Sequence, residues 1–214
     1  MSSAITTGGA FDDMFSAGSG RFVGSDGQFE HLAVRQWAGD TDQADRQLFT
    51  ERCTGRTLDI GCGPGRLVGD LVARGIPALG IDVSLEAVRR TRVRGAMAVQ
   101  VDVFDDVPWP GRWDHALLAD GNIGIGGHPV RLLARVRDLV SPGGTVLAEV
   151  SPEGVGIVRD TRRLWVEGQY SPPFEWAVVG LDAITDVARA ADLAVRDVST
   201  HDDRHVVTLG RAED

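Results

Sequence analysis

A glycine-rich segment between Leu58 and Arg66 is the feature that most constrains the fold of this 214-residue chain. An apolar run ends there in glycines at every second position, Gly61, Gly63 and Gly65, and apolar residues at helical spacing follow directly. A strand, a glycine loop and a helix in this order form a crevice in which backbone can approach a ligand without a Cβ in the way. The segment therefore predicts a ligand-binding turn in a parallel α/β sheet.

An acidic residue indicates which part of a ligand this crevice holds. Asp82 closes a second apolar run and lies 21 positions after Gly61 (82 − 61). One carboxylate can accept hydrogen bonds from both vicinal hydroxyls of a ribose. The alternative role for Asp82 is an acid at the start of the next helix, a place that Ser84 already fills as the cap. The spacing indicates a cofactor that contains a nucleoside.

The residues of the loop distinguish between two cofactor classes. A dinucleotide fold carries G-x-G-x-x-G, so that helix amides face a pyrophosphate. Here Arg66 stands three residues after Gly63, and Pro64 removes one amide donor. With Asp59 two residues before the first glycine, the segment resembles the first motif of the class I S-adenosylmethionine (SAM)-dependent methyltransferases. In that family the loop lies against the methionine portion of SAM, which carries no phosphate.

The composition excludes other classes of site. The chain has no lysine, and all 22 basic residues are arginine. A P-loop and a pyridoxal phosphate enzyme each require a lysine, so both are excluded. The net charge of −9 (22 − 31) repels a nucleic-acid backbone, so we expect a small-molecule acceptor and no nucleic acid. Arginine-only usage with abundant Ala, Gly, Val and Asp also indicates a GC-rich bacterial genome.

The sequence contains no signal for export or membrane insertion. No apolar run approaches the roughly 20 residues that span a bilayer. The segment from Met1 to Ile5 has neither a basic region nor an apolar core. Cys53 and Cys62 are too few for a disulfide framework. We therefore expect a cytoplasmic protein with no membrane partner, and the sequence leaves its oligomeric state open.

The order of the predicted elements indicates one α/β domain after an N-terminal arm. We expect residues 1–40 to form a loosely ordered arm, with a short helical piece near Phe11 to Phe15, and a lead-in helix over 29–37. The SAM-binding domain is expected over residues 41–214. Its strands are predicted at 56–61, 78–82, 96–102, 113–119, 143–150, 194–200 and 205–211. Its helices are predicted at 41–53, 65–74, 84–94, 129–140 and 181–191.

Strands that alternate with helices form a parallel sheet with helices on both faces. The last two strands are separated by a short polar turn, so they must be antiparallel. The sequence therefore predicts an α/β fold, a doubly wound, mostly parallel, seven-stranded Rossmann-like sheet with an antiparallel C-terminal strand. This arrangement is typical of the methyltransferase family, and the resemblance covers about Arg56 to Arg211.

The resemblance assigns cofactor contacts to residues that follow the first four strands. It implies that Asp59 serves the amino group of SAM; a structural brace for the loop is the alternative. It implies an apolar adenine wall at Val83 and an acid for the adenine amino group at Asp102, with Asp105 and Asp106 as nearby alternatives for this acid. The fourth strand runs into a glycine-rich loop at the topological switch point, where open sheets bind ligands. The predicted cofactor-binding residues are Asp59, Gly61, Cys62, Gly63, Gly65, Asp82, Val83, Asp102, Val103, Asp120 and Gly121.

Methyl transfer from a sulfonium requires in-line positioning and, for many acceptors, a base. The predicted catalytic residues are Asp120, Glu149 and His201, of which the two acids are the better placed. His201 and His205 flank a turn expected on the cofactor rim, and a solvated turn is the alternative. The two histidines lack the further ligands of a zinc pattern, so no metal is expected.

Residues 151–180 interrupt the alternation and are rich in aromatic residues and arginines. We expect this segment to form a lid that recognises the acceptor. The alternative is that its aromatic side chains only pack the segment down. The N-terminal arm, with Phe15, Phe22 and Trp37, is a second candidate wall. The predicted substrate-binding residues are Asn122, Arg162, Trp165, Tyr170 and Trp176.

These predictions favour a SAM-dependent methyltransferase that acts on a small, partly apolar molecule, with oxygen as the favoured acceptor atom. We expect its role to lie in secondary metabolism. Two alternatives stay open. One is an NAD(P)-dependent oxidoreductase, which Arg66 and Pro64 disfavour. The other is a protein of the same fold that binds SAM without transferring its methyl group.

Overall fold

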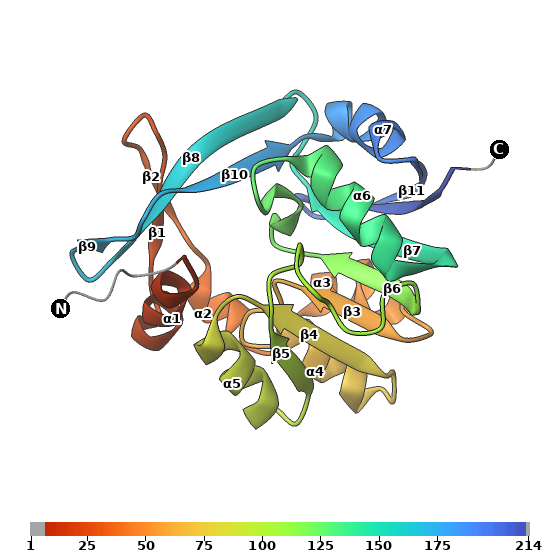
Figure 1. The fold of residues 1–214 in the computed structure, drawn as a ribbon, viewed down its shortest axis with the longest axis horizontal. Coiled ribbons are helices and arrows are strands. Elements are labelled where there is room, and N and C mark those ends of the chain that lie inside the picture. Colours follow the sequence, from red (N-terminus) through yellow and green to blue (C-terminus); the bar gives the residue numbers. More distant parts are fainter. Residues whose placement is uncertain (1–6, 213–214) are drawn as a thin grey trace.

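A central sheet of seven strands organises the computed structural model, which describes residues 7–212 (Figure 1). The strand order is β11-β12-β7-β6-β3-β4-β5. The strands are β3 (Thr57–Ile60), β4 (Ala78–Asp82), β5 (Met97–Gln100), β6 (Trp113–Leu118), β7 (Val140–Val150), β11 (Leu193–His201) and β12 (Arg204–Arg211). Strands β3, β4, β5, β6 and β7 are parallel to one another, whereas β12 is antiparallel to both β7 and β11. The predicted fold class is confirmed.

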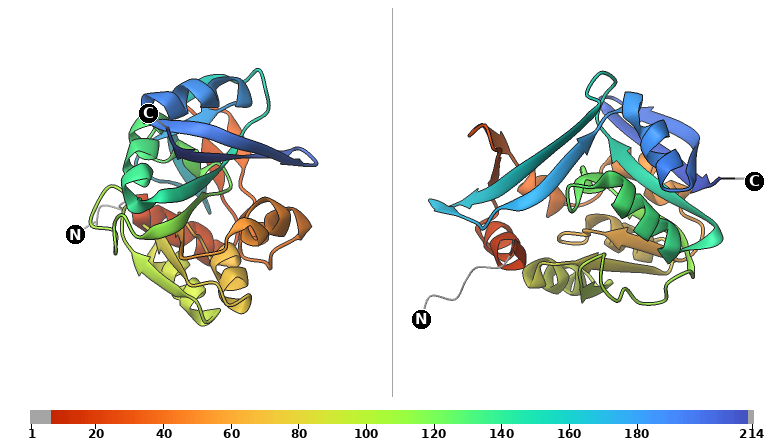
Figure 2. Two further views of the ribbon diagram at one scale, coloured as in Figure 1. Left: turned by 90° about the vertical axis from the view of Figure 1, so that its right-hand side faces the viewer. Right: turned by 45° about the horizontal axis from the view of Figure 1, so that its top comes forward.

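Helices cover both faces of this sheet (Figure 2). They are α3 (Gln43–Leu48), α4 (Arg66–Ala73), α5 (Leu85–Val93), α6 (Pro129–Leu139) and α7 (Leu181–Ala190), with the 3-10 turns η1 (Thr50–Arg52) and η2 (Asn122–Gly124). Side chains alternate between the faces along β6. Ala116 and Leu118 pack with α6 and α7, whereas Leu117 packs with α3 and α4. This double burial explains why β6 is apolar at consecutive positions.

A second, antiparallel sheet stands beside the central one and contains both ends of the lid and part of the N-terminal arm (Figure 1). Its order is β10-β8-β1-β2, and β9 pairs with β8. The strands are β1 (Arg21–Val23), β2 (Phe29–His31), β8 (Ile157–Val166), β9 (Gln169–Tyr170) and β10 (Phe174–Val179). Phe22 pairs with Leu164, and Arg162 pairs with Phe174. Residues 151–180 and the arm therefore form one structure.

The described part of the N-terminal region agrees with one prediction and differs from another. The short helical piece expected near Phe11 to Phe15 is part of α1 (Thr7–Ala17), which β1 follows. Residues 1–6, where no export signal is predicted, lie outside the described residues. The expected helix over 29–37 is instead β2 followed by the short α2 (Val34–Trp37). Pairing with β1 decides the conformation of residues 29–31, because this pairing outweighs a weak local preference for helix.

Helix α1 is tethered to the central domain by Asp12. One carboxylate oxygen of Asp12 accepts hydrogen bonds from the Ser84 hydroxyl at 2.5 Å and from the Glu86 amide at 2.8 Å. Ser84 is also the cap of α5, since its Oγ accepts from the Ala87 amide at 3.0 Å. The tether therefore joins α1 to the start of the helix that follows β4.

We expect Asp12→Ala to destabilise the protein by about 1–2 kcal/mol, because a charge-assisted pair of hydrogen bonds is lost. Thermal unfolding should then occur about 2–8 °C lower. Hydrogen exchange should also become faster within α1. Asp13→Ala is the matched control, since the neighbouring Asp13 is exposed. Equal effects of both substitutions would show that the tether contributes nothing.

No helix within residues 7–212 has the length and apolar character that crossing a membrane requires.

Candidate functional site

A cavity of about 1050 Å³ lies between the two sheets, at the carboxyl ends of β3, β4 and β6. The glycine loop after β3, the end of β4 and the loop after β6 line one side of it. Side chains from β8, β10, α1 and α2 line the other side. The position agrees with the general rule that open α/β sheets bind ligands at their topological switch point.

The glycine loop has a backbone that other residues would not adopt without strain. Gly61 has φ +70°, and an added Cβ would lie 2.6 Å from the Asn122 amide nitrogen. Gly65 has φ +83°, and its Cβ would lie 2.5 Å from the Thr91 hydroxyl. Gly63, also at positive φ, faces Phe15 of α1. Cys62 is buried beneath the loop, and burial raises the pKa of its thiol well above the ordinary value, so it is a filler and not a nucleophile.

Asp59 is a buried carboxylate with no hydrogen-bond donor among the described residues. Only 2% of the residue is exposed, yet it lies at the wall of the cavity. Burial raises its pKa to about 7, although the nearby Arg66 guanidinium acts in the opposite direction. A carboxylate without a partner in such a place is costly. Contact with a cationic group of a ligand therefore explains the Asp59 carboxylate better than the alternative role as a brace for the loop.

Asp82 holds the loop through backbone amides. Its two oxygens accept from the Gly63 amide at 2.9 Å and from the Ser84 amide at 2.8 Å. Burial raises its pKa to about 6, and these hydrogen bonds oppose the shift. Each oxygen can accept a second hydrogen bond. Asp82 therefore braces the glycine loop through these amides, and its contact with a ribose stays a prediction.

The predicted adenine end lies beyond Asp82. Val83 and Val103 line the cavity there, and Val103 is buried. Asp102 is exposed and also lines the cavity, with one oxygen accepting from the Phe104 amide at 2.9 Å. Asp102 therefore holds its own turn and keeps its other oxygen open to the cavity.

Asn122 connects the two loops that flank the cavity. Its amide nitrogen donates to the backbone carbonyls of Ile60 at 2.9 Å and Gly61 at 3.0 Å. Because both amide hydrogens are used, the side chain fixes the loop after β3 against the loop after β6. Gly121 begins the second loop at φ +80°. The side chain that we predict to bind the acceptor is thus occupied with positioning the cofactor loop.

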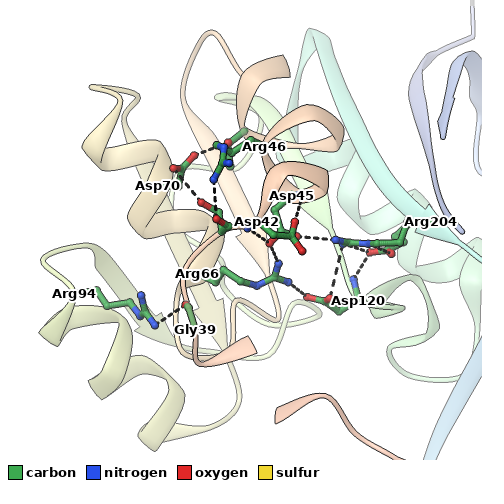
Figure 3. A network of polar contacts seen from close by, with 12 residues as sticks. Gly39, Asp42, Asp45, Arg46, Arg66, Asp70, Arg94, Asp120 and Arg204 are labelled. Carbon is green, nitrogen blue, oxygen red and sulfur yellow. Dashed lines mark hydrogen bonds and ion pairs between the residues drawn. The ribbon is translucent and has the colours of Figure 1, made fainter. Parts of the chain in front are cut away.

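The structure contains a network of charges that is not predicted from the sequence (Figure 3). Arg66, only 4% exposed, forms ion pairs with Asp45 and with Asp120, the latter at 2.5 Å. Arg204 pairs with Asp45 at 2.8 Å and with both oxygens of Glu149 at 2.8 and 3.0 Å. Two arginines therefore pair with three carboxylates, and all of these residues except Asp45 line the cavity. The charge of Arg66 also acts on the nearby Asp59.

The two acids predicted to be catalytic both belong to this network. Glu149 accepts from the Asp120 amide at 2.8 Å, in addition to its two bonds from Arg204. Asp120 has φ +53°, an unusual conformation for a residue other than glycine. Burial raises the pKa of Asp120, and the charge of Arg66 opposes this. A signal for the network was available in Arg66, because an arginine in the first turn of a helix needs acidic partners.

Only two of the four side chains predicted on residues 151–180 face the cavity. Side chains alternate along β8, so Arg162 and Leu164 share one face and Trp165 takes the other. Arg162 and Trp176 line the cavity. Trp165 lies against Phe29, outside it. Tyr170, paired with Trp165 in register, is 51% exposed.

His201 does not line the cavity either. Strand β11 is parallel to β7, so the turn after it does open on the cofactor rim, as expected. Asp203 and Arg204 of this turn reach the cavity. The His201 ring instead forms a hydrogen bond with the Gln47 side chain at 2.8 Å. The prediction that His201 is catalytic and the prediction that Trp165 and Tyr170 bind the substrate are therefore corrected, because these three residues lie outside the cavity lining.

The N-terminal arm supplies the remaining wall. Phe15, Phe22 and Trp37, the second candidate wall in the sequence, all line the cavity. Phe22 also contacts Trp176, with ring centroids 5.4 Å apart. The arm and the lid therefore act together. Within residues 7–212, no group of three or more His, Cys, Asp or Glu side chains is arranged as a metal site.

Comparison with known proteins identifies a domain family and several similar folds. Residues 57–144 match a family described as a methyltransferase domain. The search of curated proteins gave no match. Among solved structures, the chain is similar to a SAM-dependent methyltransferase from Bacteroides fragilis in complex with S-adenosyl-L-homocysteine (SAH). The identity is 20%, the TM-score is 0.79, and 96% of this chain and 94% of that one are covered.

Two further structures share the fold at lower similarity. One is the Burkholderia thailandensis 1,6-didemethyltoxoflavin-N1-methyltransferase with its bound acceptor and SAH, at 19% identity and TM-score 0.58, covering 80% of this chain and 77% of that one. The other is an O-methyltransferase from neocarzinostatin biosynthesis with SAM and 2-hydroxy-5-methyl naphthoic acid. Its identity is 20% and its TM-score 0.56, with 82% of this chain and 52% of that one covered. At these identities the likeness concerns the fold.

Proposed function

The chain carries a class I, SAM-dependent methyltransferase domain, and from this premise we propose that it transfers the methyl group of SAM to an oxygen atom of a small-molecule acceptor. The buried carboxylate of Asp59, which has no protein partner among the described residues, is the observation that carries the proposal. An ammonium group is the natural partner for such a carboxylate. SAM has one at its methionine end.

The other predicted cofactor residues fit the remaining parts of SAM. Gly61 and Gly63 adopt positive φ, which glycine does without strain, and both line the cavity, so the loop backbone can lie against the methionine chain. Asp82 keeps acceptor capacity toward ribose hydroxyls, and Val83 offers an apolar surface to the adenine. When bound, SAM supplies a methyl carbon made electrophilic by its sulfonium sulfur. The role of these residues is to fix the position of that carbon.

The same loop is unsuited to a dinucleotide. A diphosphate would need a positive charge at this loop. Arg66, at the start of α4, carries one, but its guanidinium is already paired with Asp45 and Asp120. Pro64 provides no amide. A diphosphate would also lie close to the carboxylate of Asp59, which would repel it. These contacts favour SAM over NAD(P), the cofactor of the first alternative.

For catalysis we assign different roles to Asp120 and Glu149. Glu149 is held by Arg204 through both oxygens, so it is poorly placed to take a proton, and we assign it a positioning role. Asp120 lies at the cavity wall with a pKa raised by burial, which makes it the better base for an acceptor hydroxyl. His201 has no role in this proposal because it lies outside the cavity.

The proposed setting is the cytoplasm of a bacterium, in secondary metabolism. Two free cysteines and arginine-only usage support it. Two of the similar structures bind small ring compounds, which supports a small-molecule acceptor for this chain as well.

The test is calorimetry with SAM, SAH and NADPH, followed by measurement of SAH formed with a panel of phenols. We expect SAM and SAH to bind, NADPH not to bind, and SAH to accumulate with at least one phenol. Binding of NADPH alone would overturn the proposal. Binding of SAM without SAH formation from phenols, amines or carbon acids would support the non-transferring alternative.

A further inference from the structure

The half of the cavity away from the glycine loop is walled by aromatic side chains from four helices and strands. They are Phe11 from α1, Phe22 from β1, Phe174 and Trp176 from β10, and Trp37 from α2. Phe22, Phe174 and Trp176 contact one another with centroids 5.4 to 6.3 Å apart and tilted or edge-to-face rings. Such walls favour a flat aromatic ligand.

One arginine lies in this aromatic wall with most of its donors unused. The Arg162 side chain is 13% exposed and lines the cavity, with its guanidinium 5.3 Å from the centre of the Phe22 ring. A guanidinium has five N–H donors. Among the described residues it makes a single hydrogen bond, from one terminal nitrogen to Glu30 at 2.9 Å. Its Nε is buried without a hydrogen-bond partner.

The two carboxylates near Arg162 satisfy it incompletely. Glu30 is 63% exposed on the edge strand β2, so this ion pair is screened by solvent and contributes little. Asp160 lies 3.7 Å from Nε, beyond hydrogen-bond distance, and accepts from the Ser25 amide instead. A guanidinium in a largely apolar wall with free donors is suited to a planar anion from the cavity.

We propose that Arg162 binds an anionic group, a carboxylate or a comparable acid, on an aromatic methyl acceptor whose ring lies against Phe22 and Trp176. The proposal rests on the proposed function and names the class of its acceptor. It requires no covalent step by Arg162.

The strand register also places the anion away from the methylated atom. Trp176 forms an isolated bridge with Ile125 in the loop after β6, next to the predicted methionine end of the cofactor. Arg162 pairs with Phe174, two residues further along β10, which is about 7 Å away. The acid should therefore be separated from the methyl-accepting atom by about one aromatic ring. A phenol with a carboxylate on the opposite end of the ring has this shape.

The experiment compares three ligands that share one phenol ring and differ in charge. They are 3-(4-hydroxyphenyl)propanoate, its neutral amide, and the cationic 3-(4-hydroxyphenyl)propylamine. Their affinities are measured by calorimetry with the full chain saturated with SAH. We expect the propanoate to bind about 10-fold or more tightly than the amide, and the amine most weakly. SAH binding is measured first, so that failure of the proposed function is seen separately.

Arg162→Met should reduce the propanoate affinity to that of the amide, and Arg162→Lys should keep part of the preference. Arg159→Met is the matched control, since Arg159 lies on the same strand, is exposed and is outside the cavity lining. The inference is overturned if the amide or the amine binds as tightly as the propanoate, or if none of the three binds. It is also overturned if folded Arg162→Met keeps the propanoate affinity. If that variant does not fold, the order of the three affinities in the unmodified protein decides.

Discussion

Replacing Asp59 with asparagine is expected to weaken SAM binding by about 100-fold or more, without loss of the fold. The substitution keeps the size of the side chain and removes the charge that would face the ammonium group. Breaking a buried charge pair by removing one partner costs about 3–5 kcal/mol, which corresponds to roughly 150- to 4000-fold in affinity. Calorimetric titration with SAM and with SAH measures the change directly.

The matched control for this substitution is Asp138→Asn. Asp138 is exposed near the end of α6 and lies outside the cavity lining. We expect its SAM affinity to stay within about threefold of the unmodified protein, because exposed charges interact weakly in water. An Asp59→Asn protein that binds SAM within the same range would remove the central observation behind the proposed function.

The pH dependence of SAM binding gives a second test of Asp59. Its pKa in the free protein is raised to about 7 by burial, so below pH 7 the carboxyl is mostly protonated and lacks the charge that attracts an ammonium. SAM affinity should therefore rise from pH 6 to about 7.5, with release of a proton on binding. Above about pH 8 it should fall as the α-amino group of SAM loses its proton. Asp59→Asn should abolish the rise below pH 7.

The same pKa predicts how Asp59 affects stability. An aspartate that titrates near 7 when folded and near 4 when unfolded binds more protons in the folded state between these values. Its contribution is thus fully present below about pH 4 and is lost as the pH rises through 7. We therefore expect ligand-free Asp59→Asn to unfold at a higher temperature than the unmodified protein at pH 8. This gain should become smaller toward pH 5 and vanish below about pH 4.

The central sheet could be predicted because its signals are local. The glycine loop, the cap at Ser84 and the proline at the start of α6 each mark a boundary within a few residues of the chain. The short turn between β11 and β12 permits only an antiparallel pair. Nothing from a distant segment is needed for these inferences.

The second sheet could not be predicted because its pairing is long-range. Residues 21–23 pair with residues 163–165, and neither segment indicates its partner by composition. Without the register, the side chains on β8 cannot be divided between its two faces. Both Arg162 and Trp165 are therefore plausible ligand contacts in the sequence, and only the alternation fixed by β1 and β10 separates them.

The charge network shows the same limit for the site. Asp45, Arg66, Asp120 and Arg204 come from four separate segments, so the sequence does not indicate which of them pair, although Arg66 in the first turn of a helix indicates a need for acidic partners. Burial joins them. Although burial alone would raise the pKa of Asp45, the hydrogen bonds from Arg66 and Arg204 hold it below its ordinary value. This network holds α3, α4 and the loop after β6 together on one side of the cavity.

Arg66→Met is therefore expected to destabilise the protein by about 3–5 kcal/mol, because the buried Asp45 loses one of its two partners and Asp120, whose side chain is 26% accessible, loses the closer of its two cations. Thermal unfolding should occur about 6–20 °C lower at pH 8. The loss should become smaller toward pH 5, since without the guanidinium both carboxyls have higher pKa values and their protonation removes the unpaired charges. Arg189→Met is the control: its ion pair with Asp186 is exposed, with 74% and 81% of the two side chains accessible, so its removal should have almost no effect. If Arg66→Met unfolds like this control, or if its defect is independent of pH, the network does not stabilise the fold in the way its geometry indicates.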